Sequence, residues 1–152
     1  LLVENAQKMK IKIISPVVTD AIQFSSEELF ERVIVDPPCS GWGTARKHPE
    51  LRWEKTEQDI QQMCKIQRKM LEKGASLVKP GGILVYSTCT IMRKENDQIV
   101  EEFLVKHKDF TLESAEEFFD PSVVSERGFI KTYPNIPLLD GGFAARVKRK
   151  PN

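Results

Sequence analysis

The chain has 152 residues, of which 40% are hydrophobic and 30% charged, a composition typical of one compact globular domain. No apolar run approaches the roughly 20 residues that cross a bilayer, and no signal-peptide pattern opens the chain, so we expect no membrane partner. Lys and Arg number 23 against 22 Asp and Glu, so net charge alone neither indicates nor excludes a nucleic-acid partner.

The apolar pattern alternates between helix and strand periods from the start of the chain. Residues 1–9 have the spacing of a helix end, and the β-branched run at 11–18 predicts a short strand. Residues 26–30 predict a single helical turn. This turn leads into a buried strand at 32–35, which the two prolines that follow it end.

The longest predicted element is a helix that begins after Thr56, an N-cap residue with Asp59 three positions on. The run Lys79-Pro80-Gly81-Gly82 is predicted to end this helix and to turn the chain into a second buried strand at 83–86. A second helix is predicted over about 94–107.

The C-terminal part of the chain has a weaker pattern. The segment 109–140 contains several prolines and is predicted to be irregular, with one short strand near 129–130. A last strand is predicted over 142–147. The whole pattern predicts an α/β fold with parallel β–α–β units and helices on both faces of one sheet.

Chemically unusual residues follow the two buried strands. The segments 36–43 and 87–90 both come directly after a predicted strand, and ligands of parallel sheets bind at the carboxyl ends of the strands. We therefore expect these segments to share one site.

Each of these segments contains a cysteine. Cys39 and Cys89 follow the strands, whereas Cys64 lies on the apolar face of the long helix. A thiol at a strand end can be activated as a nucleophile, while a cysteine among apolar side chains is inert, and placement alone leaves both roles open for Cys39 and Cys89. No Cys-x-x-Cys pair supplies zinc ligands, and three cysteines do not make a disulfide framework. A reducing, cytoplasmic compartment is favoured.

Two motifs resemble the signatures of the RNA cytosine-5 methyltransferases. Asp36-Pro37-Pro38-Cys39-Ser40-Gly41 resembles their first cysteine motif, and Tyr86-Ser87-Thr88-Cys89-Thr90 resembles their second. The loop at 46–53 is similar to that of the bacterial small-subunit rRNA enzymes of the RsmB (Fmu or Sun) type. Glu95-Asn96 and the segment 140–143 also fit, so the resemblance extends over essentially the whole chain.

The resemblance implies a Rossmann-like, S-adenosylmethionine-dependent methyltransferase that acts on C5 of a cytosine in RNA. Its implied substrate is 16S rRNA, with tRNA as the main rival. It implies that Cys89 is the nucleophile that adds to C6 and that Cys39 helps the covalent adduct to break down. Asp36 is implied to bind the base or the cofactor, and Asp20 the adenosyl group of the cofactor. A turn-forming role is the structural alternative for both aspartates.

A cytosine must leave its stack before a thiolate can approach C6. The positively charged loop offers candidate contacts to RNA phosphates and an aromatic side chain for stacking. These candidate residues are Arg46, Lys47, His48, Arg52 and Trp53. A solvated loop without a ligand is the alternative.

The N-terminal part of the sequence departs from the family pattern. The family's glycine-rich cofactor loop does not occur in this chain, since Pro80-Gly81-Gly82 lies in a helix-to-strand turn. We therefore expect residues 1–152 to be the C-terminal part of the catalytic domain, lacking its first two strands. The segment 11–18 would then have no neighbouring strand, and the strand at 32–35 would have an open edge able to pair with another chain.

Other classes of function stay open beside this one. An RNA-binding remnant without catalysis fits the missing glycine-rich loop. An amino-group methyltransferase uses Asp-Pro-Pro followed by an aromatic residue, but Cys39 takes that position here. A cysteine hydrolase needs a histidine near its thiol, and only His48 lies near either motif in the sequence.

Overall fold

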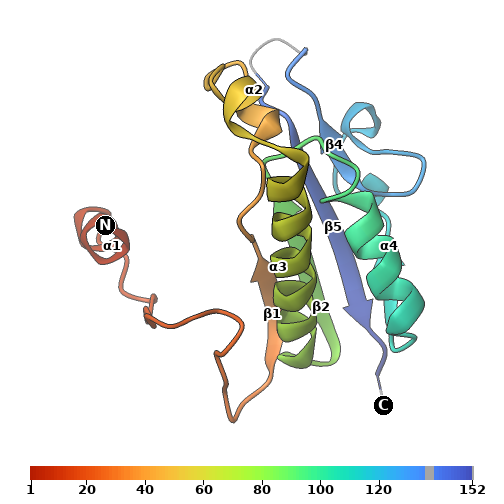
Figure 1. Ribbon diagram of the computed structural model, residues 1–152. Helices are drawn as coiled ribbons and strands as arrows, with labels where there is room; N and C mark the ends of the chain where they lie inside the picture. The colour runs from red at the N-terminus through yellow and green to blue at the C-terminus, as the bar shows by residue number, and fades with distance from the viewer. Residues whose placement is uncertain (136–138, 152) are drawn as a thin grey trace.

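The computed structural model describes residues 1–135 and 139–151 of the chain. Figure 1 shows a sheet with two long helices in front of it, and an N-terminal segment that extends away from it. Among the described residues, no helix is long and apolar enough to cross a membrane. The elements are α1 (Leu2–Lys8), β1 (Phe30–Val35), η1 (Trp42–Thr44), α2 (Leu51–Glu54), α3 (Glu57–Ser76), β2 (Val78–Thr88), α4 (Asp97–Lys106), β3 (Phe110–Glu113), η2 (Ala115–Glu117), η3 (Pro121–Val123), β4 (Ile130–Thr132) and β5 (Gly142–Arg149).

The sheet has the strand order β1-β2-β5-β3, and β4 also pairs with β5. Strands β1 and β2 are parallel, with Val33 opposite Leu84, and α3 makes the crossover between them as predicted. Strand β5 runs antiparallel to β2, with Phe143 opposite Thr88, so the two motif-bearing strands end beside the start of β5. The carboxyl ends of β1 and β2 therefore lie at one edge.

Helices α3 and α4 lie on the same face of the sheet and contact each other (Figure 1). The prediction of helices on both faces is therefore wrong for the described part of the chain. Gly74 lets α3 approach the sheet closely, because a Cβ atom at that position would overlap Val35 Cγ2 and lie 3.2 Å from Leu84 Cδ1. These side chains belong to one apolar core, which extends through β2 and β5 to α4.

The start of α3 is fixed by the predicted N-cap. Thr56 Oγ1 accepts a hydrogen bond from the Asp59 amide at 3.2 Å, and the Asp59 carboxylate accepts one from the Thr56 amide at 2.8 Å. The end of the helix was predicted too late: α3 ends at Ser76, and the run Lys79–Gly82 lies inside β2. The pairing of β1 with β2 shifts register beside this run, where Pro80 has no amide hydrogen to donate.

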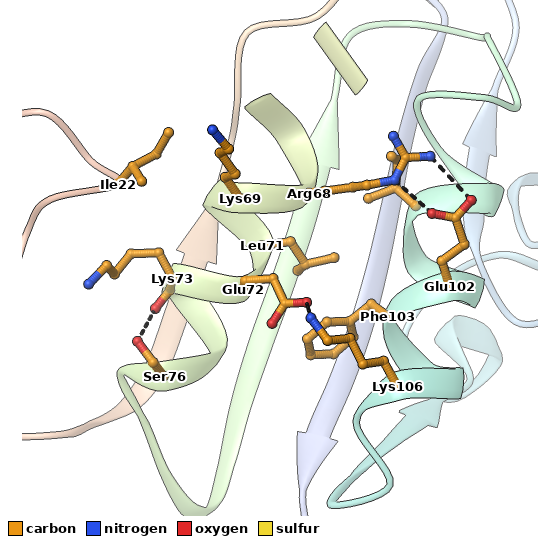
Figure 2. A pocket seen from close by; sticks show the side chains of 11 residues that line it. Ile22, Arg68, Lys69, Leu71, Glu72, Lys73, Ser76, Glu102, Phe103 and Lys106 are labelled. Carbon is orange, nitrogen blue, oxygen red and sulfur yellow. Dashed lines mark hydrogen bonds and ion pairs between the residues drawn. The ribbon is translucent and has the colours of Figure 1, made fainter. Parts of the chain in front are cut away.

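Ion pairs join the exposed edges of α3 and α4 (Figure 2). Arg68 Nε lies 2.7 Å from Glu102 Oε2, and Lys106 Nζ lies 2.7 Å from Glu72 Oε1. They border a hollow of about 580 Å³ between the helices, which contains neither cysteine motif. The hollow therefore lies between α3 and α4 and is separate from the ends of β1 and β2, where the cysteine motifs are.

The N-terminal segment has less regular structure than the sequence predicts. Helix α1 is confirmed, but the strand predicted at 11–18 is wrong: these residues form no strand, and Ile13 is 94% exposed. A β-branched run forms a strand only where a neighbouring strand accepts its hydrogen bonds, and no described strand lies beside it. The helical turn predicted at 26–30 is also wrong, since β1 already begins at Phe30.

The segment after α4 contains more structure than the predicted single short strand. The predicted strand near 129–130 is present as β4, but β3 and the two short 3-10 helices η2 and η3 were not predicted. Strand β3 pairs with the far half of β5, and Phe110 at its start packs edge-on against Phe103 of α4. Pro137, one of the prolines in the segment 109–140 that was predicted to be irregular, lies outside the described residues.

Candidate active site

The two motif cysteines meet at the edge of the sheet. Cys39 follows β1 and Cys89 follows β2, and their Sγ atoms lie 3.3 Å apart although 50 positions separate them in the sequence. Cys89 is exposed and Cys39 is partly buried. Cys64 is buried in α3, where its Sγ faces the carbonyl of Lys94 at 3.4 Å, as its place in the apolar stripe predicts. The structure thus places both cysteines where the strand pattern predicted them.

The surroundings of Cys39 favour the protonated thiol. Burial is the largest cause, followed by the hydrogen bond and the charge interaction with Cys89, and together they raise the pKa of Cys39 from 9.0 to about 12. Backbone hydrogen bonds at Gly41 and Cys89 act in the opposite direction and are weaker. Cys39 therefore holds its proton beside the exposed Cys89 sulfur.

A buried carboxylate connects the residues that follow the two cysteines. Glu95 is 0% exposed and lies just before α4. Its Oε1 accepts a hydrogen bond from the Ser40 amide at 2.9 Å, and its Oε2 accepts one from the Ser40 hydroxyl. The Thr90 hydroxyl lies 3.3 Å from the same Oε2 and 2.8 Å from Ser40 Oγ.

Two further buried side chains bind this carboxylate and the backbone around it. Gln67 of α3 donates from Nε2 to Glu95 Oε1 at 2.8 Å and to the carbonyl of Pro38 at 3.0 Å. The Tyr86 hydroxyl donates to the Glu95 carbonyl at 2.7 Å. The sequence prediction missed these contacts, although Gln67 interrupts the apolar stripe of α3 and a buried polar residue indicates a polar partner.

Two glycines bring the loop after Cys39 against the second motif. The Gly43 amide donates to the Cys89 carbonyl at 3.0 Å, and the Gly141 amide donates to the Gly43 carbonyl at 2.8 Å. A Cβ atom at Gly43 would overlap the Gly141 carbonyl and lie 2.6 Å from the Cys89 oxygen. Only a glycine fits this close approach of three backbone segments.

The predicted RNA-binding residues lie on the loop and on α2, beside the cysteines in sequence. Arg46 and Lys47 both pair with Asp140, Arg46 at 3.7 Å, and the Lys47 ammonium is the largest cause that lowers the pKa of Asp140. His48 pairs with Glu50 at 3.1 Å. The remaining two, Arg52 and Trp53, lie on α2, where Trp53 is 87% exposed. Their role in RNA binding stays a prediction.

The two predicted aspartates differ in their surroundings. Asp36 is exposed directly after β1, three residues before Cys39. Asp20 forms a local turn, in which its Oδ1 accepts a hydrogen bond from the Ile22 amide at 2.9 Å, and no described contact joins it to the cysteines. In residues 1–135 and 139–151, no group of three or more His, Cys, Asp or Glu side chains could hold a metal ion.

Known proteins match this chain over nearly its full length. The probable ribosomal RNA small subunit methyltransferase B of Bacillus subtilis is 35% identical over 99% of this chain and 35% of its own length. The crystal structure of PH0851 is 37% identical and covers 97% of this chain and 34% of that chain, with a TM-score of 0.88. The structure of NSun6 from Pyrococcus horikoshii with SFG is 26% identical, with a TM-score of 0.85 over 99% of this chain and 38% of that chain.

The chain thus spans about a third of the length of these relatives. Their agreement with the structure confirms the Rossmann-like methyltransferase fold that the two cysteine motifs implied. Residues 1–148 match the family model described as 16S rRNA methyltransferase RsmB/F, and the chain belongs to this family.

Proposed function

We propose that this chain is the C-terminal part of the catalytic domain of a cytoplasmic, S-adenosylmethionine-dependent methyltransferase that modifies C5 of a cytosine in 16S rRNA. The observation that carries this proposal is the pair of thiols 3.3 Å apart at the ends of two adjacent parallel strands. C5 of cytosine is a weak nucleophile, and its methylation needs a group that adds to C6 first. One exposed and one partly buried thiol, side by side, supply such a group and a partner for it.

In this proposal Cys89 is the nucleophile. Its thiolate sulfur forms a bond to C6 of an unstacked cytosine, and the electron pair of the C5–C6 double bond moves to C5. S-adenosylmethionine, when bound, supplies an electrophilic methyl group to C5. Loss of the C5 proton to solvent water then restores the double bond, breaks the S–C6 bond and returns the electron pair to Cys89. Because Cys89 is exposed, the cytosine ring can reach its sulfur, and water can reach the adduct.

Cys39 and Asp36 have supporting roles in the same proposal. Cys39 holds a proton 3.3 Å from the Cys89 sulfur, so it can hydrogen-bond this sulfur as the adduct breaks down and the thiolate returns. Asp36 is exposed at the end of β1 and takes part in no hydrogen bond with the described residues. Its carboxylate could therefore hydrogen-bond N3 of the base, where it would favour the protonation that activates C6.

The residues of this chain fit the cofactor in part. The Asp36 carboxylate is a suitable acceptor for the polar groups of S-adenosylmethionine at a strand end. Asp20 is a weaker candidate, because one of its oxygens is already bonded within its own turn. A cleft of about 610 Å³ lies beside β1, between the strand, α3 and the N-terminal segment, and Asp36 is part of its lining. We propose Asp36 as the cofactor contact that this chain supplies.

The substrate assignment rests on the family description and on the basic loop. Arg46, Lys47 and Arg52 carry positive charge close in sequence to the cysteine motif, and Trp53 presents an exposed ring on which a base could stack. Small-subunit rRNA is favoured because it is the substrate named for the family model that matches the chain. Transfer RNA is the alternative that a substrate comparison would reveal.

A trapping experiment tests the proposal. In a hybrid protein, residues 1–148 of this chain replace the matching segment of the Bacillus subtilis relative, and the hybrid is incubated with cofactor and 5-fluorocytidine-labelled 16S rRNA or tRNA. Fluorine at C5 cannot leave as a proton, so a covalent adduct should persist on a denaturing gel. We expect the adduct to be lost in Cys89→Ser and to persist in Cys39→Ser.

The variant pattern also identifies the wrong assignment. An adduct lost in Cys39→Ser but kept in Cys89→Ser would exchange the two roles. A Cys64→Ser variant is the matched control, since Cys64 lies in α3 away from the strand ends, and it should form the adduct. Cofactor and RNA binding without an adduct in any protein would contradict the proposal and favour an RNA-binding remnant.

A further inference from the structure

The most connected buried charge in the described part of the chain is not one of the proposed catalytic groups. The Glu95 carboxylate is 0% exposed, and backbone and side-chain donors from three different segments surround it. Burying a carboxylate is unfavourable unless hydrogen bonds compensate for the lost water. A side chain retained at this cost therefore needs an explanation in terms of what it holds in place.

The positions of its partners supply this explanation. Ser40 follows Cys39 and Thr90 follows Cys89, so Glu95 binds the residue directly after each cysteine. The Ser40 and Thr90 hydroxyls also bind each other at 2.8 Å. Each cysteine is the residue directly before one of these two, so the bridge joins the two segments whose sulfurs lie 3.3 Å apart.

Glu95 is itself fixed from the other side. Its backbone carbonyl accepts the Tyr86 hydroxyl at 2.7 Å, and its Oε1 accepts Gln67 Nε2 at 2.8 Å. Tyr86 lies on β2, and Gln67 lies on α3. Glu95 is thus held by the sheet and by the crossover helix α3. Its carboxylate in turn holds the two cysteine loops in place relative to these elements.

We infer that Glu95 is a positioning residue, which holds the Cys39 and Cys89 sulfurs in contact by bridging Ser40 and Thr90. The inference rests on the proposed function, in which the neutral Cys39 thiol must reach the Cys89 sulfur. Glu95 touches neither sulfur nor substrate, and it acts through the two loop residues. Its loss would let the loops separate and would lower the rate of every step that needs both sulfurs together.

Disulfide formation measures the separation of the sulfurs without any RNA or cofactor. The 152-residue chain is treated with diamide, which takes up the two electrons and two protons that the thiols lose, and the Cys39–Cys89 bond is followed by mass spectrometry. We expect Glu95→Gln to form this bond at least about tenfold more slowly than the unmodified chain. Asp97→Asn is the matched control, because Asp97 is also buried but pairs with Lys131, and its rate should not change.

Single-arm variants keep the test decisive if Glu95→Gln does not fold. Thr90→Ala removes the hydrogen bond of Glu95 to the loop that follows Cys89. Ser40→Ala removes the hydroxyl contacts on the other side, where the Ser40 amide still donates to Glu95 Oε1. Both should slow disulfide formation, Thr90→Ala more than Ser40→Ala. An unchanged rate in both, with circular dichroism like that of the unmodified chain, would overturn the inference.

A second measurement separates this inference from the proposed function. In the hybrid protein, Glu95→Gln should lower kcat about tenfold or more and leave the KM for RNA nearly unchanged, since the fully buried Glu95 side chain has no exposed surface for RNA to contact. A slow disulfide without any RNA adduct would support positioning and contradict the methyltransferase proposal. An RNA adduct together with an unchanged disulfide rate would support the methyltransferase proposal and contradict the positioning role of Glu95.

Discussion

The two neighbouring cysteines differ in how far they are exposed to water. Cys39 is partly buried, and its pKa rises to about 12, mainly because burial disfavours the thiolate. Cys89, 3.3 Å away, is exposed to water. The difference in solvation supports the proposed division of roles, in which Cys39 keeps its proton and Cys89 is the nucleophile.

Selective alkylation should reveal this division. At pH 8, iodoacetamide should modify Cys89 well before Cys39, because only the thiolate reacts and little of Cys39 is ionised below its pKa of about 12. The rate at Cys39, measured by peptide mass spectrometry in Cys89→Ser, should still rise above pH 9.0, the ordinary thiol value, because burial, the largest cause of the raised pKa, remains when the contributions of Cys89 are removed. A plateau near pH 9.0 would contradict the assignment.

The same shift affects stability, with a defined sign. The folded chain holds the Cys39 proton more tightly than the unfolded chain does, so the contribution to stability is complete below about pH 9.0. It is lost as the pH rises from there toward about 12.

At the scale of elements, the contact of α3 with the sheet depends on one missing side chain. Gly74 lies inside a 20-residue helix, where glycine costs about 1 kcal/mol relative to alanine. A methyl group there would overlap Val35 and approach Leu84, both of which are buried. Overpacking of this kind costs about 1–3 kcal/mol, so the steric cost exceeds the gain in helix propensity.

We therefore expect Gly74→Ala to destabilise the chain by about 1 kcal/mol, measured by urea unfolding. The double variant Gly74→Ala with Val35→Ala should show coupling, because the smaller residue at 35 makes room for the methyl group. Additive effects of the two substitutions would show that the contact does not limit packing.

Local signals account for the elements that the sequence predicted. The N-cap of α3 is decided by residues three positions apart, and the apolar run of β2 is buried as predicted. The prediction of a buried strand at 32–35 is wrong in part, because Val35 is buried but Ile34 is exposed on the face of β1 turned away from the core. The segment 11–18 has the same β-branched pattern and forms no strand, because strand formation depends on a neighbour that the pattern cannot specify. Strand β3 was missed for the reverse reason, since its partner β5 lies more than thirty residues away in sequence.

The candidate site divides in the same way. The cysteines could be placed at one edge because parallel strands bring their carboxyl ends together. The bridge through Glu95 could not be derived, because Ser40, Thr90 and Gln67 come from three separate segments and converge only in the fold. The role of Asp20 toward the cofactor stays a prediction, since the structure shows only that its Oδ1 accepts the Ile22 amide within a local turn.

For the molecule as a whole, the sheet is unequally protected at its two sides. Strand β1 pairs only with β2 among the described strands, whereas β3 and β4 cover the opposite side of β5. Ile34 on β1 is 74% exposed. A strand with one unpaired edge and exposed apolar side chains is a site for pairing with another chain.

Sedimentation velocity should therefore show self-association of the 152-residue chain that increases with concentration. Ile34→Lys should reduce it, since a lysine on an edge strand opposes pairing. Val105→Lys changes a comparably exposed apolar residue on α4 and should have no such effect. Equal sedimentation of all three proteins would show that the β1 edge does not pair.

The ion pairs of Asp140 connect the segment before β5 to the loop after Cys39 and affect how selective this loop can be. The Asp140 carboxylate already lies against the side chains of Lys47, 93 positions earlier in the sequence, and of its neighbour Arg46. An RNA phosphate that binds Arg46 and Lys47 must displace the Asp140 carboxylate. Asp140 therefore competes with RNA for these two cations. Weakly complementary nucleic acids would gain little from such an exchange, whereas a substrate that also inserts its base beside Cys89 would gain enough to make the displacement favourable.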